Sequence, residues 1–370
     1  MTRALLTTGI FPPDIGGPAT YIPNFSSYLK KNGIEVQVIT LSSEEKSSKM
    51  DYPYSVVRIK RNRKRLKRIL ITIKKISESL RKADDLFCNG LYYETAIAIR
   101  ITRFSGNSVV KIVGDPVWER EENRVPRDRE KSLFFSVFYK TFGKLERLFL
   151  VWSLKQFRNI TCPGRELGRT INMWDSSFKP VVIENGVQIS DLIIRETKKF
   201  DLICVSRLVP WKNVGKVITL AKTLNCSLAV IGDGPIRSEL QDLASNNSKI
   251  VFLGARDSAF VRRSLIESKV FCQFSDYEGL SFSLLQAMSL GIPCLLSKIP
   301  ANKAVFESDP SAAIYFADKD VPDILDQVKS LISSDLERQE LGAKCRKIIA
   351  KHFNEDIQLQ KMRMLLVNHE

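Results

Sequence analysis

Short apolar runs alternate with longer amphipathic segments along the whole chain. In the first half the apolar runs, which have the character of strands, lie at 4–10, 35–41, 55–59, 86–90 and 108–114. Helical periodicity appears between them, for example over 19–32 and 94–104. The second half repeats the alternation with apolar runs at 201–207, 227–234, 249–254, 270–275 and 293–297. Because strands that alternate with helices form parallel sheets covered on both faces, the pattern predicts two α/β layers in series.

A polar and charged stretch separates the two halves, and we expect the linker at 188–199. At 370 residues the chain exceeds what one hydrophobic core usually fills, which also favours two domains. We therefore predict an N-terminal domain over 1–190 and a C-terminal domain over 191–352. The last segment, 353–370, is expected to form a helix that packs back on the N-terminal domain.

Composition adds one strong feature, a net charge of +16. The hydrophobic fraction of 44% and the charged fraction of 26% are typical of a soluble globular protein. The excess of lysine and arginine favours partners that carry phosphate, whether nucleotides, nucleic acid or anionic lipid. The seven cysteines are dispersed without a CxxC pair, which is typical of reduced thiols in a cytoplasmic protein.

Several kinds of active site are disfavoured by what the chain lacks. Its two histidines, His352 and His369, are too few for a histidine zinc site or a Ser-His-Asp triad. There is no GxxxxGK(S/T) sequence, and no GxGxxG follows a predicted strand. The first apolar run is too short for a signal peptide, and no apolar segment is long enough to cross a bilayer. We expect a cytoplasmic location.

Two loops that follow predicted strands carry groups suited to a diphosphate. Arg207 and Lys212 lie at the carboxyl end of the first strand of the second half, where open α/β sheets bind ligands. A guanidinium offers a planar fork to phosphate oxygens and an ammonium offers a compact charge. Gly16 and Gly17 precede a helix, so the backbone there can approach a ligand with exposed N–H groups. From spacing alone, solvated loop cations are an equally good interpretation of Arg207 and Lys212.

Together these motifs resemble those of retaining glycosyltransferases with the GT-B fold, of the family 4 type. The resemblance is strongest in SRLVPWKN (206–213), IGDGPIRSEL (231–240), IVFLG (250–254) and EGLSFSLLQAMSLGIPCLLS (278–297). NGV (185–187) and PPDIGGPATYI (12–22) match as well. The resemblance implies an α/β GT-B fold, in which two Rossmann-like doubly wound parallel-sheet domains face each other across a cleft.

The resemblance also assigns the donor site. Glu278 matches the first acid of the family's E-x7-E motif, near the sugar, and Gln286 takes the place of the second, near the ribose. Glutamine keeps an acceptor oxygen but loses the charge, so we expect weaker or altered donor affinity rather than inactivity. A degenerate, non-catalytic relative is the alternative. The other donor-binding residues implied are Gly16, Gly17, Arg207, Lys212, Gly279, Leu280 and Ser281.

On the acceptor side the family often has a histidine that this chain lacks. Asp115, at the end of a predicted strand, is the candidate to orient the acceptor or receive its proton, and Asn89 and Tyr92 are weaker candidates. An aspartate before a proline fits a helix cap or turn at least as well. The resemblance implies a front-face reaction in which the leaving diphosphate helps to take the acceptor's proton.

The expected catalytic residues are Glu278, Arg207, Lys212 and Asp115. Arg207 and Lys212 would stabilise negative charge on the leaving group. No metal ion or other cofactor is expected, because the nucleotide-sugar is itself a substrate. The DxD string at 318–320 is interpreted as surface.

Two basic segments, 58–75 and 131–158, suggest a membrane surface as partner. The second mixes Phe, Leu and Trp with Lys and Arg, as expected of a peripheral protein that docks on anionic lipid and uses a lipid-linked acceptor. A buried helix pair with an exposed cationic face explains it equally well.

The leading hypothesis is a hexosyltransferase that moves sugar from a UDP- or GDP-sugar to a glycan or lipid-linked acceptor. It would serve cell-surface polysaccharide or glycolipid synthesis, in the cytoplasm or on the inner face of the cell membrane. A nucleic-acid-binding protein is an alternative, but no recognised binding motif supports a nucleic-acid partner. A GT-B sugar-nucleotide epimerase is another, disfavoured by the shortage of histidine.

Overall fold

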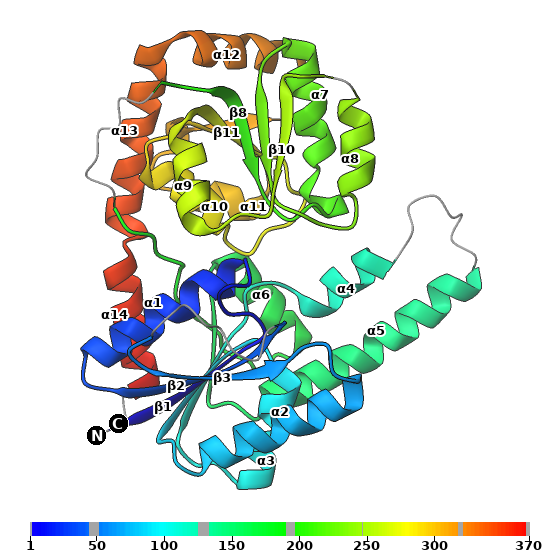
Figure 1. The fold of residues 1–370 in the computed structure, drawn as a ribbon, viewed down its shortest axis with the longest axis vertical. Coiled ribbons are helices and arrows are strands. Elements are labelled where there is room, and N and C mark those ends of the chain that lie inside the picture. The colour runs from blue at the N-terminus through cyan, green and yellow to red at the C-terminus, as the bar shows by residue number, and fades with distance from the viewer. Residues whose placement is uncertain are drawn as a thin grey trace. The chain divides into compact units, whose positions relative to one another are not determined.

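The computed structural model describes residues 2–43, 52–124, 133–189, 197–245, 247–316 and 321–367 (Figure 1). The chain divides into two compact units: unit 1 consists of Met1–Ile183 and Leu359–Glu370, and unit 2 of Glu184–Gln358. The chain therefore enters unit 2 slightly before the predicted boundary at 190, and it returns to unit 1 within its last helix. Part of the predicted linker, 190–196, lies outside the described residues.

Unit 1 is built on a parallel sheet with the strand order β3-β2-β1-β4-β5-β6-β7. The strands are β1 Arg3–Thr8, β2 Glu35–Ser42, β3 Ser55–Lys60, β4 Asp85–Asn89, β5 Asn107–Lys111, β6 Asn159–Cys162 and β7 Val181–Val182. The helices are α1 Gly17–Lys31, α2 Arg65–Leu80, α3 Tyr92–Thr102, α4 Pro116–Arg124, α5 Leu133–Leu154 and α6 Arg165–Trp174. The direction of winding changes between β1 and β4.

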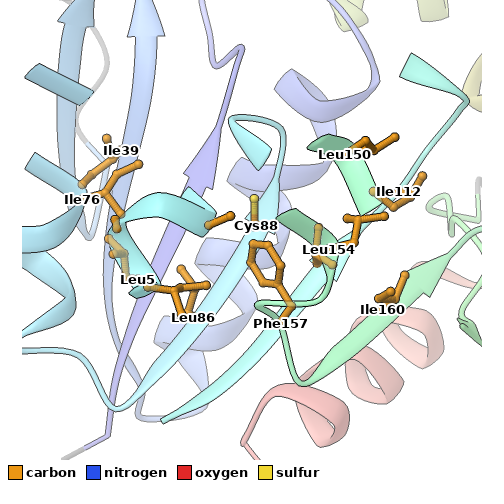
Figure 2. Close-up of a cluster of buried hydrophobic side chains, with 14 of the residues drawn as sticks. Leu5, Ile39, Ile76, Leu86, Cys88, Ile112, Leu150, Leu154, Phe157 and Ile160 are labelled. Atoms are coloured by element: carbon orange, nitrogen blue, oxygen red, sulfur yellow. The ribbon is translucent and has the colours of Figure 1, made fainter. Parts of the chain in front are cut away.

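Alternation along the strands gives this sheet two apolar faces. Leu86 and Cys88 of β4 belong to a buried cluster that also includes Leu154 of α5 (Figure 2). Phe87, between them, points to the opposite face, where its ring lies 5.0 Å from that of Phe25 in α1. Because successive strand residues face opposite sides, helices on both faces bury the apolar surface of the sheet.

Unit 2 repeats this plan with the strand order β10-β9-β8-β11-β12-β13, again all parallel. The strands are β8 Phe200–Val205, β9 Leu228–Ile231, β10 Ile250–Gly254, β11 Ser268–Gln273, β12 Cys294–Ser297 and β13 Ala313–Phe316. The helices are α7 Val214–Leu224, α8 Arg237–Ala244, α9 Ser258–Ile266, α10 Phe282–Ser289, α11 Pro300–Val305, α12 Val321–Ser333 and α13 Asp335–His352. Helix α14, Glu355–Val367, starts in unit 2 and ends in unit 1. In Figure 1, α7 and α8 cover one face of this sheet and α9 and α10 the other.

The predicted fold class, doubly wound parallel α/β in both halves, is confirmed. All ten predicted strands are present, whereas β6, β7 and β13 were not predicted. These three are short, with two to four residues each, and they lie at or near one edge of their sheets. Length alone does not set them apart, because the predicted strands β9 and β12 also have four residues.

The two ends of unit 2 lie side by side. Val187 forms a parallel bridge with Asn354, and its N–H donates to the Phe353 carbonyl at 2.9 Å. Gly186 is packed so closely that a Cβ atom there would lie 2.5 Å from Cα of Glu355. The NGV turn therefore joins the start of unit 2 to the start of α14. That helix contributes to unit 1, where Asn107 donates to the carbonyls of Leu365 and Leu366.

Two further features concern composition. All seven cysteines are buried and free, as the dispersed apolar positions indicate. Within the described ranges, no helix is both long enough and apolar enough to cross a membrane.

Candidate functional site

The site in unit 2 forms where the winding of its sheet changes direction. Strands β8 and β11 are hydrogen-bonded neighbours there, and the loops at their carboxyl ends diverge to opposite sides. In doubly wound sheets this switch point is the usual place for a ligand. The loop after β8 carries Arg207 and Lys212, and the loop after β11 carries Glu278. The topology therefore brings together residues that are about seventy positions apart in the sequence.

Lys212 and Glu278 form an ion pair at this point. Lys212 Nζ donates to Glu278 Oε1 at 2.5 Å, and the two side chains are only 13% and 9% exposed. The Ser275 hydroxyl donates to the same oxygen at 2.6 Å. Within the described ranges no hydrogen bond reaches Oε2 of Glu278, so that oxygen is the one left to accept from a ligand.

Hydrogen bonds from the loop after β8 fix the loop after β11. Asn213, in a left-handed conformation with φ of 48°, donates through Nδ2 to the carbonyl of Phe274 at 3.0 Å and to Oδ1 of Asp276 at 2.6 Å. The Asp276 N–H donates to the Trp211 carbonyl at 2.8 Å. These bonds tie the loop that carries Lys212 to the loop that carries Glu278. Asn213 was missed by the sequence reasoning, although it ends the SRLVPWKN motif.

Arg207 is exposed, and its guanidinium lies over the ring of the buried Trp211, 5.7 Å from the ring centroid. Its loop rests on the glycine turn after β9. A Cβ at Gly232 would lie 1.8 Å from the Ser206 carbonyl oxygen, and one at Gly234 would lie 2.2 Å from that of Leu208. Only glycine permits this approach, so the IGDGP turn acts as a support for the Arg207 loop.

Helix α10 begins at Phe282, later than a helix running from Glu278 would. Ser281 is its N-cap, and its hydroxyl accepts from the Leu284 N–H at 3.3 Å. Gly279 and Leu280 therefore belong to the loop, and Gln286 is a partly exposed residue of the helix. Leu284 and neighbouring apolar residues of α10 are buried in the core of unit 2. The stretch thus presents an acid, a loop and a helix N-terminus in succession, and a helix N-terminus attracts phosphate.

The Leu280 carbonyl has a partner that the sequence reasoning did not assign. Asn185 of the NGV turn is buried and donates through Nδ2 to this carbonyl at 3.2 Å. Its Oδ1 is also buried and accepts no hydrogen bond within the described ranges. The signal was present, because NGV is one of the motifs that carried the resemblance.

Unit 1 has its own switch point, between β1 and β4, and Gly16 and Gly17 lie there. Gly16 has φ of +147° and caps α1, and a Cβ on it would lie 2.8 Å from Ile10 Cδ1. Arg61 holds this loop: its Nη2 donates to the Gly9 carbonyl at 3.0 Å and to Asp14 Oδ2 at 2.6 Å. Sequence reasoning placed Arg61 only within a basic run and missed this contact.

The three acceptor-side candidates lie on the same edge of unit 1, in different environments. Asn89 ends β4 and is buried, and its Oδ1 accepts no hydrogen bond within the described ranges. Tyr92 begins α3 and its hydroxyl donates to the Lys111 carbonyl at 3.3 Å; burial raises the pKa of this tyrosine. Lys111 is fully buried and its Nζ lies 3.9 Å from the centroid of the Tyr21 ring.

Asp115 acts as a helix cap. Its Oδ1 accepts from the N–H groups of Val117 and Trp118, each at 3.0 Å, at the start of α4. Its Oδ2 accepts from Arg147 of α5 at 2.7 Å. The cap interpretation of this aspartate is therefore the one that the geometry displays. A role toward an acceptor stays a prediction, and it would require Asp115 to act while it holds these three donors.

No three His, Cys, Asp or Glu side chains in the described ranges are grouped so that they could hold a metal ion. The DxD string at 318–320 lies outside those ranges. The charged side chains that the described loops carry to the switch point of unit 2 therefore include two cations, Arg207 and Lys212, and one carboxylate, Glu278.

Comparison with known proteins identifies relatives. Residues 190–348 match the family described as "Glycosyl transferases group 1". The chain is 24% identical over 170 residues to N-acetyl-alpha-D-glucosaminyl L-malate synthase of Bacillus anthracis, covering 44% of each. It is 24% identical over 204 residues to UDP-Gal:alpha-D-GlcNAc-diphosphoundecaprenol alpha-1,3-galactosyltransferase of Escherichia coli, covering 52% of this chain and 51% of that one. The chain thus spans about half the length of the curated relatives it matches.

The fold has a wider match. The structure of Anabaena HepE in complex with UDP and glucose is similar with a TM-score of 0.72, at 14% identity, over 98% of both chains. At that identity the likeness concerns the fold alone. It agrees with the predicted GT-B fold, which is thereby confirmed.

Proposed function

We propose that this protein is a glycosyltransferase that uses a nucleotide-sugar donor, because residues 190–348 match the family "Glycosyl transferases group 1". Its acceptor is a glycan or a lipid-linked sugar, and its product belongs to polysaccharide or glycolipid synthesis. One observation carries the proposal: Arg207, Lys212 and Glu278 converge at the switch point of unit 2, before the N-terminus of α10. This set offers two cations to a diphosphate and a carboxylate to a sugar.

The donor is proposed to be a UDP- or GDP-hexose. The names of one relative and one fold neighbour mention UDP-galactose, and UDP with glucose, respectively, which favours UDP. In this chain the diphosphate would lie against the amide end of α10, with Arg207 beside it. Oε2 of Glu278 would accept from a hydroxyl of the sugar, because Oε1 already accepts from Lys212 and Ser275.

For the reaction we propose retention of the anomeric configuration without a metal ion. The acceptor oxygen attacks the anomeric carbon on the face from which the diphosphate leaves, and a diphosphate oxygen takes the acceptor's proton. Arg207 and Lys212 stabilise the charge that develops on the diphosphate as the glycosidic bond to it breaks. Lys212 would share its N–H donors between Glu278 and the phosphate, since an ammonium has three.

A donor screen followed by substitution tests this function. UDP- and GDP-hexoses are titrated against the protein, and turnover is followed with lipid-linked and free sugar acceptors. Arg207→Ala and Glu278→Ala should each lower turnover at least ~100-fold, as removal of a transition-state donor does elsewhere. Arg256→Ala is the matched control, because Arg256 also lies over an aromatic ring, that of Phe260, at 4.8 Å. Unchanged turnover in both site variants would refute the assignment.

The product of the reaction distinguishes this function from inverting transfer and from epimerisation. Proton NMR of the glycoside reports the anomeric configuration, and inversion would contradict the proposed mechanism. Full activity is expected after treatment with EDTA. Formation of an epimeric nucleotide-sugar without transfer would favour an epimerase instead.

We further propose that unit 1 docks on the inner face of an anionic membrane. On α2, Leu66 and Leu70 are 78% and 67% exposed, one turn apart, and cationic residues surround them in the run at 58–75. Within the segment at 131–158, residues 133–154 form one long helix, α5, instead of a helix pair. Its described part exposes apolar residues at i, i+3, i+4 and i+7: Leu145, Leu148, Phe149 and Trp152. Exposed apolar stripes beside cations are typical of helices that bind at a lipid interface.

Vesicle sedimentation tests the membrane surface. The protein should bind vesicles of phosphatidylglycerol and much less those of phosphatidylcholine. Replacing Leu66 and Leu70 together by Ser should weaken binding ~10-fold or more, because each buried leucine is worth about 1.5 kcal/mol or more. Leu336→Ser is the control, because Leu336 is equally exposed but belongs to unit 2. Equal binding by both variants would refute docking through α2.

A further inference from the structure

A series of hydrogen bonds leads to Glu278 from the neighbouring strands β11 and β12. Gln273 ends β11 and donates through Nε2 to Asn302 Oδ1 at 3.2 Å. Asn302, in α11, donates through Nδ2 to the carbonyl of Ser297 at 2.9 Å and to its hydroxyl oxygen at 3.3 Å. Ser297 ends β12, and its hydroxyl donates to the Ser275 carbonyl at 2.5 Å. Ser275 in turn donates to Glu278 Oε1.

The series has one consistent direction and little access to water. Each side chain donates to a group of the next residue, from Gln273 through Asn302, Ser297 and Ser275 to Glu278. Gln273 and Asn302 are almost fully buried, and so is Ser275. A buried polar group that loses its partner retains the full cost of desolvation, so such a series keeps its geometry.

Two hydrogen bonds hold the backbone from which Ser275 reaches Glu278. Ser297 donates to the Ser275 carbonyl, and Asn213 donates to the adjacent Phe274 carbonyl. From this backbone the Ser275 hydroxyl donates to Oε1 of Glu278, which also accepts from Lys212. Both donors thus occupy Oε1, and Oε2 is the oxygen left for a ligand.

We infer that Ser297 and Asn302 are positioning residues for Glu278, which they act on through Ser275. They touch no substrate in this arrangement. Their effect is to keep Oε2 aimed at the donor sugar, so their loss should slow the reaction more than it weakens nucleotide binding. The inference rests on the proposed function for its kinetic consequence, but the geometric consequence stands without it.

The test compares Ser297→Ala, at the end of β12, with a variant of a matched serine at the start of β11. Ser268 is fully buried and its hydroxyl donates to the Ser264 carbonyl at 2.6 Å, so Ser268→Ala removes the same kind of bond far from Glu278. With the nucleotide-sugar that the unaltered protein turns over, Ser297→Ala should lower kcat about tenfold and leave the donor KM within about twofold, since small misplacements of catalytic groups have effects of this order. Ser297→Thr, which keeps the hydroxyl, should restore kcat. Ser268→Ala should leave kcat unchanged.

The inference would be overturned if Ser297→Ala and Ser268→Ala had the same kcat. It would also be overturned if Ser297→Ala lowered kcat and Ser297→Thr lowered it as much. If Ser297→Thr does not fold, Asn302→Ala takes its place and should lower kcat with the Ser297 hydroxyl still present. If the unaltered protein turns over no nucleotide-sugar, that result refutes the proposed function instead. In that case a crystal structure of Ser297→Ala decides: the inference requires that Ser275 move out of hydrogen-bond range of Glu278 Oε1, and an unchanged contact would overturn it.

Discussion

The ion pair between Lys212 and Glu278 makes a quantitative prediction about stability. At 2.5 Å and an effective dielectric constant of about 20, the direct attraction is about 7 kcal/mol, most of which offsets the desolvation of both charges. Removing only the cation leaves a carboxylate that is 9% exposed. We therefore expect Lys212→Met to destabilise unit 2 by about 3 kcal/mol, at the lower end of the range for a broken buried pair because both groups reach the surface.

The double variant Lys212→Met/Glu278→Gln separates the energy of the ion pair from the cost of losing one of its side chains. Glutamine keeps an acceptor oxygen for the Ser275 hydroxyl, so no buried charge and no unpaired hydroxyl should result. Its destabilisation should be only about 1 kcal/mol, about 2 kcal/mol less than that of Lys212→Met alone. The single variant Glu278→Gln completes the cycle from which the coupling energy of the pair is calculated.

Urea denaturation followed by fluorescence measures these values. Trp211 is the tryptophan of unit 2, adjacent to Lys212 and buried, so the other three, Trp118, Trp152 and Trp174, are replaced by Phe. With a slope of about 2 kcal/mol/M, Lys212→Met should lower the midpoint by about 1.5 M.

A second ion pair in unit 2 serves as the control. Lys199 and Glu267 lie 2.6 Å apart, but Lys199 is 61% exposed. Because solvent screens this pair, Lys199→Met should cost less than about 1 kcal/mol. If Lys199→Met and Lys212→Met destabilise unit 2 equally, the reasoning from burial is refuted.

Three further predictions concern single positions. Gly232→Ala should destabilise unit 2 by more than about 4 kcal/mol or prevent folding, because its Cβ would overlap the Ser206 carbonyl. Gly33→Ala, at φ +79° with open space around the Cβ, should cost only about 1 kcal/mol. Equal melting temperatures of the two variants would contradict this. Burial raises the pKa of Cys204 and Cys226 to about 11 from 9.0, so at pH 8 about one thiol in a thousand is ionised. Iodoacetamide should therefore modify both cysteines only after denaturant is added, as mass spectrometry would show. Gln286→Glu should tighten nucleotide-sugar binding several-fold in calorimetry, because a carboxylate accepts stronger hydrogen bonds, and weaker binding would argue against a ribose contact.

The strands of the two sheets were predictable because their apolar runs are bounded by turn residues. β6, β7 and β13 were not predicted, and the two residues of β7 are too few to show a repeat. Motif order predicted Arg207, Lys212 and Glu278 as site residues, and the switch point explains why Lys212 and Glu278 lie in contact. Their pairing in the protein was not predictable, because spacing along the chain does not say which side chains share a hydrogen bond.

Three polar residues show where sequence reasoning stopped. Asp115 was assigned to the acceptor side with a helix cap as the alternative, and the structure shows the cap, but nothing in the sequence indicated Arg147 as its second partner. Arg61 was hidden in a basic run, although its partner is a loop fifty residues away. Asn302 lies in no motif at all, and only the fold brings it between β11 and β12. In each case a tertiary contact decides the role.

The bridge between Val187 and Asn354 gives unit 2 adjoining points of entry and exit. Unit 2 is one continuous stretch of chain whose ends adjoin, so it can be exchanged as a block. Unit 1 consists of two separated stretches, and both have to be kept together for it to fold. Recombination at these two points would therefore exchange unit 2 as a whole and leave both stretches of unit 1 in place. If unit 2 binds the donor as proposed, such an exchange would change the donor without rebuilding the other unit.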